Sequence, residues 1–288
     1  MNAAQFHSSR KFAQTKFGKI AYVERGEGPR AAMLVHGLPL NGFQWREVLE
    51  DLASTRRCLA PDLMGLGYGE IESGTDLSFG GQATMLSAFL DALGIDSVDL
   101  CGNDTGGGVS QVFAATAANR VRTLTLTNCE VADLWPNEML TGFYAGVKSG
   151  AVVQGFKMML ADASIARAQF GSVYESAETL TPELLEVYLG PLVASEARIA
   201  GLAGLAQWER SRQELVARAP ALRASKIPAQ IIWGEADTAF DKTASLGWFK
   251  KNLGGLKRTV LVPRAKLFFP EEHPRLTSTL LKEFWEAN

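Results

Sequence analysis

The chain has 288 residues, of which 47% are hydrophobic and 21% charged, and its formal net charge is −2. A chain of this length and composition folds around a large apolar core, and its scattered Lys and Arg residues give no reason to expect nucleic acid or an anionic membrane as partner. No run resembles a signal peptide or a membrane span, so we expect a cytoplasmic protein. The cysteines lie in or beside apolar runs and are expected to be buried thiols, with no disulfide or metal site: Cys58, Cys101 and Cys129.

Short apolar runs predict strands in both halves of the chain. They lie at 19–24, 31–36, 57–63, 97–102, 121–128, 229–234 and 258–263. Most are almost continuously apolar, which is typical of strands buried on both faces of a sheet. Helix-length segments lie between the later runs, among them Gln82–Leu93 and Gly107–Asn119. This alternation predicts an α/β fold with right-handed crossovers and a mainly parallel sheet.

Residues 131–222 interrupt that alternation with helical periodicity and almost no strand signal. We interpret this range as a helical lid inserted after the strand at 121–128. The core domain then consists of residues 1–130 and 223–288.

The stretch "CGNDTGGGVS", Cys101–Ser110, places Asp104 among four glycines between a predicted strand and a predicted helix. Glycines allow the sharp turn and the close approach of strand and helix. The side chain at its apex projects at the carboxyl edge of the sheet, beside a helix start that favours negative charge. We therefore predict that Asp104 is a nucleophile or a base. The alternative is an aspartate that only caps the helix.

Several motifs together give the chain a resemblance to a known family. They are "VHGLPLNGFQW" (35–45), "PDLMGLGYG" (61–69), "GNDTGG" (102–107) and "WGEADTAF" (233–240). Over nearly its whole length the chain resembles α/β-hydrolases of the haloalkane dehalogenase and epoxide hydrolase branch, which carry a helical lid where residues 131–222 lie.

The resemblance implies that Asp104 is the nucleophile and that the backbone amides of Leu38 and Thr105 form an oxyanion hole. It further implies that Asp237 is the acid that orients a histidine, and that no cofactor is needed. A carboxylate can displace a halide or open an epoxide at carbon, which gives an alkyl-enzyme ester that water must then cleave.

The family's catalytic histidine falls in a pattern like His-Phe-x-x-Glu-Glu-x-Pro, and the matching stretch here is "LFFPEEHP", with Leu267 at the histidine position. A leucine cannot accept a proton, so the usual hydrolysis of the ester lacks its base. His7 is expected to be exposed and His36 structural. Several alternatives stay open: His273 or Lys266 as base, Asp104 itself as the base of a lyase or isomerase, or a binding protein that has lost turnover.

Other positions also depart from the family. Dehalogenases commonly hold the halide with a Trp after the nucleophile and often an Asn in the His-Gly-x-Pro segment, where this chain has Thr105 and Leu38. Epoxide hydrolases use two lid tyrosines, and the insertion offers three: Tyr144, Tyr174 and Tyr188. In some relatives the acid follows the strand at 121–128, where Glu130 lies. Either acid near Asp104 would raise its pKa.

We expect the lid to cover an apolar pocket above Asp104. The residues assigned to this pocket are Trp135, Phe143, Tyr144, Trp208 and Leu267. An apolar pocket predicts a small or medium uncharged organic substrate. The sequence leaves the substrate's identity and the oligomeric state open.

Overall fold

A computed structural model describes residues 1–72, 74–136 and 138–288, with only the backbone of residue 139. In these residues the core is a nine-stranded sheet in the order β1-β2-β4-β3-β6-β7-β8-β9, with β5 beside β2. Every pair from β4 to β9 is parallel, and the pairs of β2 with β1, β4 and β5 are antiparallel. The mainly parallel sheet is therefore confirmed. The strands are β1 (Lys11–Thr15), β2 (Gly18–Arg25), β3 (Ala31–Val35), β4 (Arg57–Pro61), β5 (Glu70–Ile71), β6 (Val98–Asn103), β7 (Val121–Thr127), β8 (Ala229–Gly234) and β9 (Leu256–Val262).

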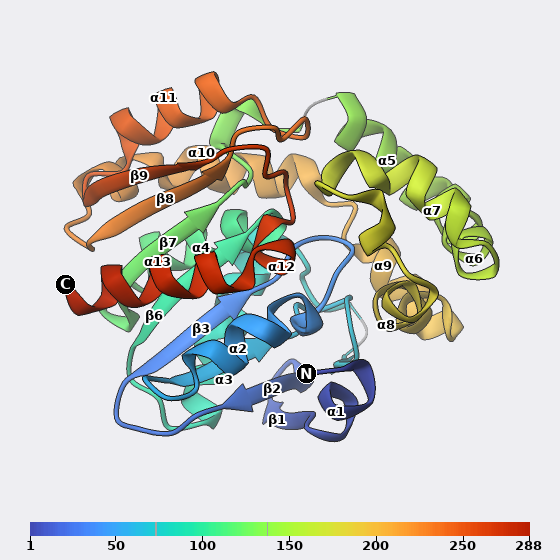
Figure 1. Cartoon of the computed structure of the whole chain (residues 1–288), viewed down its shortest axis with the longest axis horizontal. Helices are drawn as coiled ribbons and strands as arrows, with labels where there is room; N and C mark the ends of the chain where they lie inside the picture. Colours follow the sequence, from blue (N-terminus) through green and yellow to red (C-terminus); the bar gives the residue numbers. More distant parts are fainter. Residues whose placement is uncertain (73, 137) are drawn as a thin grey trace.

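Helices cover both faces of this sheet, which explains why its central strands are apolar along their whole length (Figure 1). On one face α3, α4, α10 and α11 pack together, and on the other α2, α12 and α13 do so. Their bounds are α2 (Arg46–Leu52), α3 (Phe79–Ala92), α4 (Thr105–Thr116), α10 (Trp208–Ala224), α11 (Lys242–Asn252), α12 (Phe269–Glu272) and α13 (Pro274–Glu286); a short α1 (Ala3–Ser8) precedes β1. The predicted buried state of the three cysteines is confirmed.

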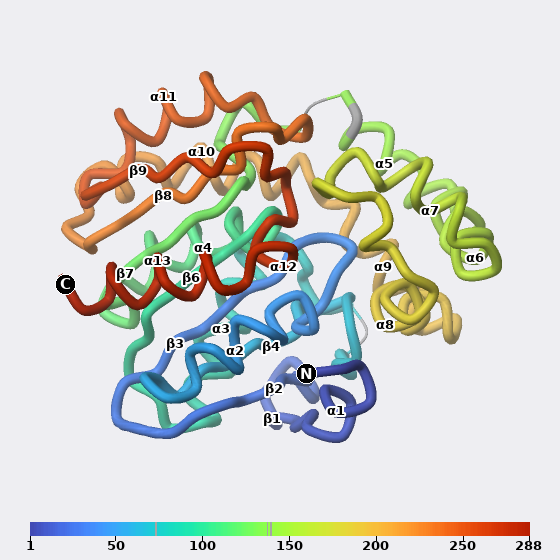
Figure 2. The backbone as a smooth tube through the Cα atoms, in the orientation of Figure 1, coloured from blue at the N-terminus to red at the C-terminus, as the bar shows by residue number. Residues whose placement is uncertain are grey.

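The segment between β7 and β8 forms a separate group of helices beside one end of the sheet (Figure 1). These helices pack on one another: α6 contacts α5, α7 and α8, and α9 contacts α8 and α5. They are α5 (Glu138–Ser149), α6 (Ala151–Ala161), α7 (Ala163–Phe170), α8 (Pro182–Val193) and α9 (Glu196–Gly204). The tube in Figure 2 shows the chain leaving the core after β7 and returning through α10. Most of α10 lies in the range predicted for the lid, yet it packs on α3 and α4; the division into core and lid stays a prediction.

The helices of the described residues include none that is both long and apolar enough to cross a bilayer. The short 3-10 turns η3 (Ala132–Leu134), η4 (Gly171–Val173) and η5 (Ala177–Thr179) connect the helices that follow β7.

The turn between β6 and α4 is the feature that positions the candidate site. Asp104 has a φ of 51° and a ψ of −131°, a backbone conformation that residues other than glycine rarely adopt. A Cβ on Gly106 would lie 2.2 Å from the carbonyl oxygen of Val35, and one on Gly107 would lie 2.3 Å from Cβ of Cys129. Glycine is therefore required at positions 106 and 107, because helix α4 starts in direct contact with the Val35 backbone and the Cys129 side chain.

Candidate functional site

The Asp104 carboxyl group is buried at the start of α4, with 4% of the residue exposed. The backbone amide of Leu38 donates a hydrogen bond to its Oδ2 at 2.7 Å. Burial raises the pKa of Asp104 to about 7, and the charge of Asp237 acts in the same direction; backbone hydrogen bonds from Leu38 and Thr105 act against both. The two amides predicted to form an oxyanion hole thus converge on this carboxyl group.

Two further carboxyl groups lie near Asp104: Asp237, which is partly buried, and Glu130, which is buried. Asp237 follows β8 and accepts hydrogen bonds from Nδ2 of Asn128 at 2.8 Å and from the amide of Ala239 at 2.9 Å. Burial raises the pKa of Asp237 even though these hydrogen bonds lower it.

Glu130 follows β7 and has only 1% of its surface exposed. The Thr105 hydroxyl donates to its Oε1 at 2.9 Å. Burial and the charge of Asp104 hold the pKa of Glu130 well above its usual range, against the hydrogen bond from Thr105. The structure thus brings both candidate acids to Asp104. Because neighbouring carboxyl groups cannot all ionise at low cost, the protonation of the buried Asp104 and Glu130 is coupled.

The three histidines of the chain make their contacts elsewhere. His36 accepts from the amide of Leu63 through Nε2 at 2.9 Å, so Nδ1 carries the proton that it donates to the Gly37 carbonyl at 2.8 Å. Burial lowers the pKa of His36 to about 4, which fits a neutral structural side chain. His273 bonds to Glu175 at 2.7 Å, and the exposed His7 lies against Arg10.

Leu267 occupies the place where the family pattern predicts an imidazole, and it is 5% exposed. Its backbone carbonyl accepts from Nδ2 of Asn103 at 3.0 Å, which fixes this loop to the end of β6. Its side chain lines the same cavity as Asp104. The wall of the site is therefore apolar where a base is expected.

A cavity of about 340 Å³ lies between the carboxyl ends of the strands and the helices that follow β7. Its floor includes Asp104, and its walls are almost entirely apolar. Phe143 and Leu267, two of the residues assigned to the pocket, line it. The lining residues are Leu38, Pro39, Asp104, Thr105, Leu140, Phe143, Ala151, Val152, Gly155, Phe156, Met159, Gln169, Phe170, Ser172, Val173, Ala239, Phe240, Leu267 and Phe268.

Trp135, Tyr144 and Trp208, the other three residues assigned to the pocket, border a separate void of about 20 Å³. That void also touches Leu38 and Thr105, which line the larger cavity as well, so the two spaces adjoin at these residues. Aromatic packing holds Trp135 and Tyr144 at this void. The Trp135 ring stacks on Phe79 with 5.2 Å between ring centroids, and it meets Tyr144 edge-on. A substrate-binding role for these three side chains stays a prediction.

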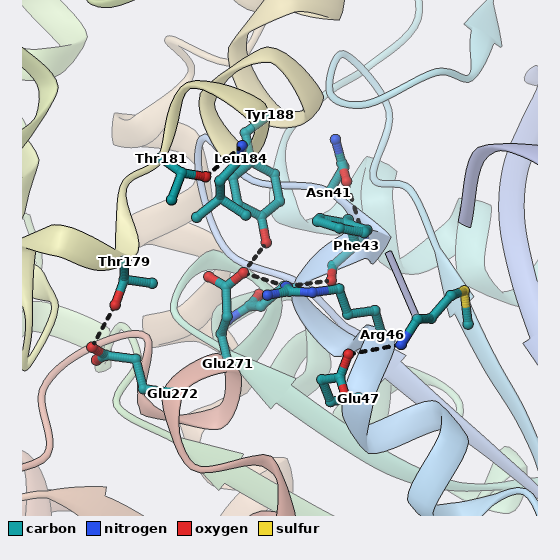
Figure 3. Close-up of polar contacts among 12 residues, drawn as sticks. Asn41, Phe43, Arg46, Glu47, Thr179, Thr181, Leu184, Tyr188, Glu271 and Glu272 are labelled. Atoms are coloured by element: carbon teal, nitrogen blue, oxygen red, sulfur yellow. Dashed lines mark hydrogen bonds and ion pairs between the residues drawn. The ribbon is translucent and has the colours of Figure 1, made fainter. Parts of the chain in front are cut away.

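Glu271 binds the other two lid tyrosines, Tyr174 and Tyr188. In the sequence, Glu271 stands out only as part of the family pattern around Leu267. The Tyr174 hydroxyl donates to the Glu271 carboxylate at 3.1 Å. The Tyr188 hydroxyl donates to the same carboxylate at 2.7 Å, and Arg46 forms an ion pair with it (Figure 3). Next to it, Glu272 accepts from the amides of Glu175 and Ser176. Residues of α12 thus fasten the α7–α8 region to the core, and neither tyrosine is among the cavity-lining residues.

The α/β hydrolase fold model matches residues 33–274, and the chain belongs to that family. Its relatives include members of the predicted branch. The chain is 28% identical over 273 residues to haloalkane dehalogenase 2 of Mycobacterium tuberculosis, covering 93% of this chain and 92% of that protein. It is 27% identical over 254 residues to a cis-3-alkyl-4-alkyloxetan-2-one decarboxylase of Shewanella oneidensis, covering 83% and 77%. Among solved structures, epoxide hydrolase CorEH aligns with a TM-score of 0.78 at 19% identity over 96% and 98% of the two chains, which shows the shared fold.

Proposed function

We propose that this protein is an α/β-hydrolase-type enzyme in which Asp104 attacks a saturated carbon of a small apolar electrophile. The observation that carries the proposal is the place of the Asp104 carboxyl group. It lies on the floor of an apolar cavity, and the Leu38 amide donates to its Oδ2 at 2.7 Å. The haloalkane dehalogenase and epoxide hydrolase relatives support this class of electrophile.

The contacts of Asp104 suit a nucleophile better than a base. In our proposal the ionised carboxylate forms an oxygen–carbon bond to the substrate, and the leaving group departs with the electron pair. The carbonyl oxygen of the resulting ester stays on the amides of Leu38 and Thr105, as the carboxyl group does now. A base acting on a carbonyl substrate would need those amides for the substrate's own oxygen.

Cleavage of the ester is the weak step of this chemistry. A water molecule must lose a proton as it attacks, and Leu267 cannot accept one. Asp237 and Glu130 are the supporting acids in the proposal, although neither has an imidazole to orient. We therefore expect the alkyl-enzyme ester to accumulate.

The test is incubation with bromohexane and, separately, with an epoxyhexane, followed by intact-mass measurement and peptide mapping. The proposal expects a mass increase on the peptide that contains Asp104, and none in Asp104→Asn. The matched control is Asp99→Asn, because Asp99 is also a buried carboxylate but binds Arg56 and Arg122 outside the cavity; it should still form the adduct. Ligand binding without adduct or product over a broad panel would instead identify a binding protein.

A second candidate is decarboxylation of a strained lactone, which Leu267 and the relative from Shewanella oneidensis favour. Asp104 would attack the ring carbon that bears the ring oxygen, breaking that carbon–oxygen bond. Loss of carbon dioxide would then form the alkene and expel the Asp104 carboxylate, so no base and no water are consumed. Gas chromatography of a reaction with a dialkyl oxetanone would show alkene and carbon dioxide; intact lactone or hydroxy acid would exclude this candidate.

A further inference from the structure

Two of the buried carboxylates outside the candidate site, Asp99 and Glu271, form ion pairs with arginines; a third, Asp62, accepts from backbone amides and feels the nearby charges of Arg10 and Arg198. Asp99 accepts from Nε of Arg56 at 2.9 Å and from Nη2 of Arg122 at 2.8 Å. Glu271 pairs with Arg46. This is the usual arrangement, because a buried charge is costly unless an opposite charge and hydrogen bonds offset it.

The three carboxyl groups at the site lack such partners. None of the ion pairs found across residues 1–72, 74–136 and 138–288 includes Asp104, Glu130 or Asp237. The hydrogen bonds that they accept come from neutral donors: backbone amides, the Thr105 hydroxyl and the Asn128 amide. Negative charge at this site is therefore not balanced by the protein.

The cavity itself offers surfaces that attract an organic cation. Asp104 is the charged residue among those that line it, and five phenylalanines form much of its wall: Phe143, Phe156, Phe170, Phe240 and Phe268. Three of them follow one another along the lid, with 6.5 Å between the ring centroids of Phe143 and Phe156 and 6.4 Å between those of Phe156 and Phe170. Aromatic faces bind alkylated ammonium groups, most strongly where water is excluded.

The same surroundings are poor for a leaving group that departs as an anion. The Leu38 amide donates to Asp104, and the Thr105 hydroxyl donates to Glu130, so both donors are already used. A halide, an alkoxide or an opened carboxylate would form against walls that are almost entirely apolar, where these donors are not free. Its negative charge would therefore gain little stabilisation there.

We propose that the electrophile is an organic cation, an alkyl sulfonium or quaternary ammonium compound, whose leaving group departs neutral. The inference rests on the nucleophilic role of Asp104 proposed above. An Asp104 oxygen bonds to the alkyl carbon, and the carbon–sulfur or carbon–nitrogen bond breaks with its electron pair on the heteroatom. The positive charge of the substrate and the negative charge of the carboxylate cancel, so a neutral ester and a neutral thioether or amine result. No proton moves, and no anion needs stabilisation.

This substrate class replaces the uncharged molecule expected from the lid's composition. Its apolar alkyl groups suit the cavity walls, and its charge supplies the partner that the Asp104 carboxylate lacks. Asp104 and the phenylalanine rings together thus select for positive charge, while the 340 Å³ of the cavity limit the size of the alkyl groups.

The experiment compares two reagents that transfer the same group: hexyldimethylsulfonium and bromohexane. The rate of adduct formation on Asp104 is divided by the rate of the same reagent with free acetate, which removes intrinsic reactivity. We expect this ratio to be at least about tenfold larger for the sulfonium, given the strength of desolvated cation–π contacts. Hexyltrimethylammonium, whose amine is a much poorer leaving group than a thioether, should also protect Asp104 from bromohexane at lower concentration than its neutral tert-butyl analogue.

The outcomes separate this inference from the proposed function. A ratio for bromohexane that equals or exceeds that for the sulfonium, with adduct on Asp104, would overturn the cationic substrate and leave the nucleophile intact. Absence of adduct from both reagents would overturn both. Asp104→Asn supplies a second measurement, because the amide keeps an acceptor for Leu38 but removes the charged group that lines the cavity. At pH 8 it should bind hexyltrimethylammonium several-fold more weakly than the parent does and bind the neutral analogue equally well; equal affinity of both proteins for hexyltrimethylammonium would count against the inference.

Discussion

Replacement of Asp104 by asparagine should make the protein more stable, because the buried carboxyl group opposes folding once it ionises. Burial raises its pKa from an ordinary 3.8 to about 7. The folded state therefore holds this proton more tightly than the unfolded state, and stability is lost as pH rises from about 4 to about 7. Asparagine has no charge to lose, and its amide oxygen can still accept from the Leu38 amide.

The size of the effect follows from the pKa. Each pKa unit corresponds to about 1.4 kcal/mol, so the ionised carboxyl group costs roughly 4 kcal/mol at pH 8. At pH 5 the folded state still holds the proton, and the cost is below about 2 kcal/mol. The gain from Asp104→Asn should therefore more than double between the two pH values.

Urea unfolding followed by tryptophan fluorescence at pH 5 and pH 8 measures these free energies. The control is Asp99→Asn, which should destabilise the protein at both pH values by about 3 kcal/mol, because it leaves Arg56 buried without its carboxylate. Two results would contradict this expectation: an Asp104→Asn variant that is no more stable than the parent at pH 8, or one that gains equally at both pH values. Either result would mean that an ionised Asp104 does not destabilise the folded protein.

Three further outcomes follow from the same contacts. The initial rate of Asp104 alkylation should rise roughly 100-fold from pH 5 to pH 9 with a midpoint near 7, because the ionised carboxylate reacts; a flat profile would contradict the raised pKa. Tyr188→Phe should lower stability by about 1.5–3 kcal/mol in urea unfolding, since its hydroxyl binds the Glu271 carboxylate. It should change the alkylation rate by less than about twofold, so a larger loss would place the hydroxyl in the site. Leu267→His should speed release of the alkyl group, measured as loss of adduct mass; an unchanged adduct lifetime would mean that more than the imidazole is missing.

Apolar periodicity predicts this fold well where strands are buried on both faces. The seven apolar runs correspond to β2, β3, β4, β6, β7, β8 and β9. The edge strand β1 was not predicted, because its residues are mostly exposed and so follow no apolar run, and β5 has only two residues. Helix α4 begins at Thr105, two residues before its predicted start, because glycines that resemble a turn in sequence are helical here.

The candidate site is only partly predictable, because its decisive contacts join distant residues. The glycines around Asp104 mark the turn, since local backbone geometry requires them. No local pattern indicates that Glu271 holds Tyr174 and Tyr188, which are 97 and 83 residues away. The same limit applies to the two candidate acids. Sequence spacing offers Asp237 and Glu130 as alternatives, whereas the fold brings both to Asp104 and buries Glu130.

Leu267 links the slow hydrolysis that we expect to the charge that we propose for the substrate. In a triad the imidazole accepts a proton and becomes a cation held by the neighbouring acid. With leucine at position 267 that cation does not form, and in our proposal the substrate brings the positive charge that pairs with Asp104. Leu267→His should therefore change two quantities at once. Ester release should become faster, and the preference for hexyldimethylsulfonium over bromohexane should fall at pH values where the imidazole is protonated. Faster release with an undiminished preference would separate the two effects and show that the cation selectivity does not depend on the missing imidazole.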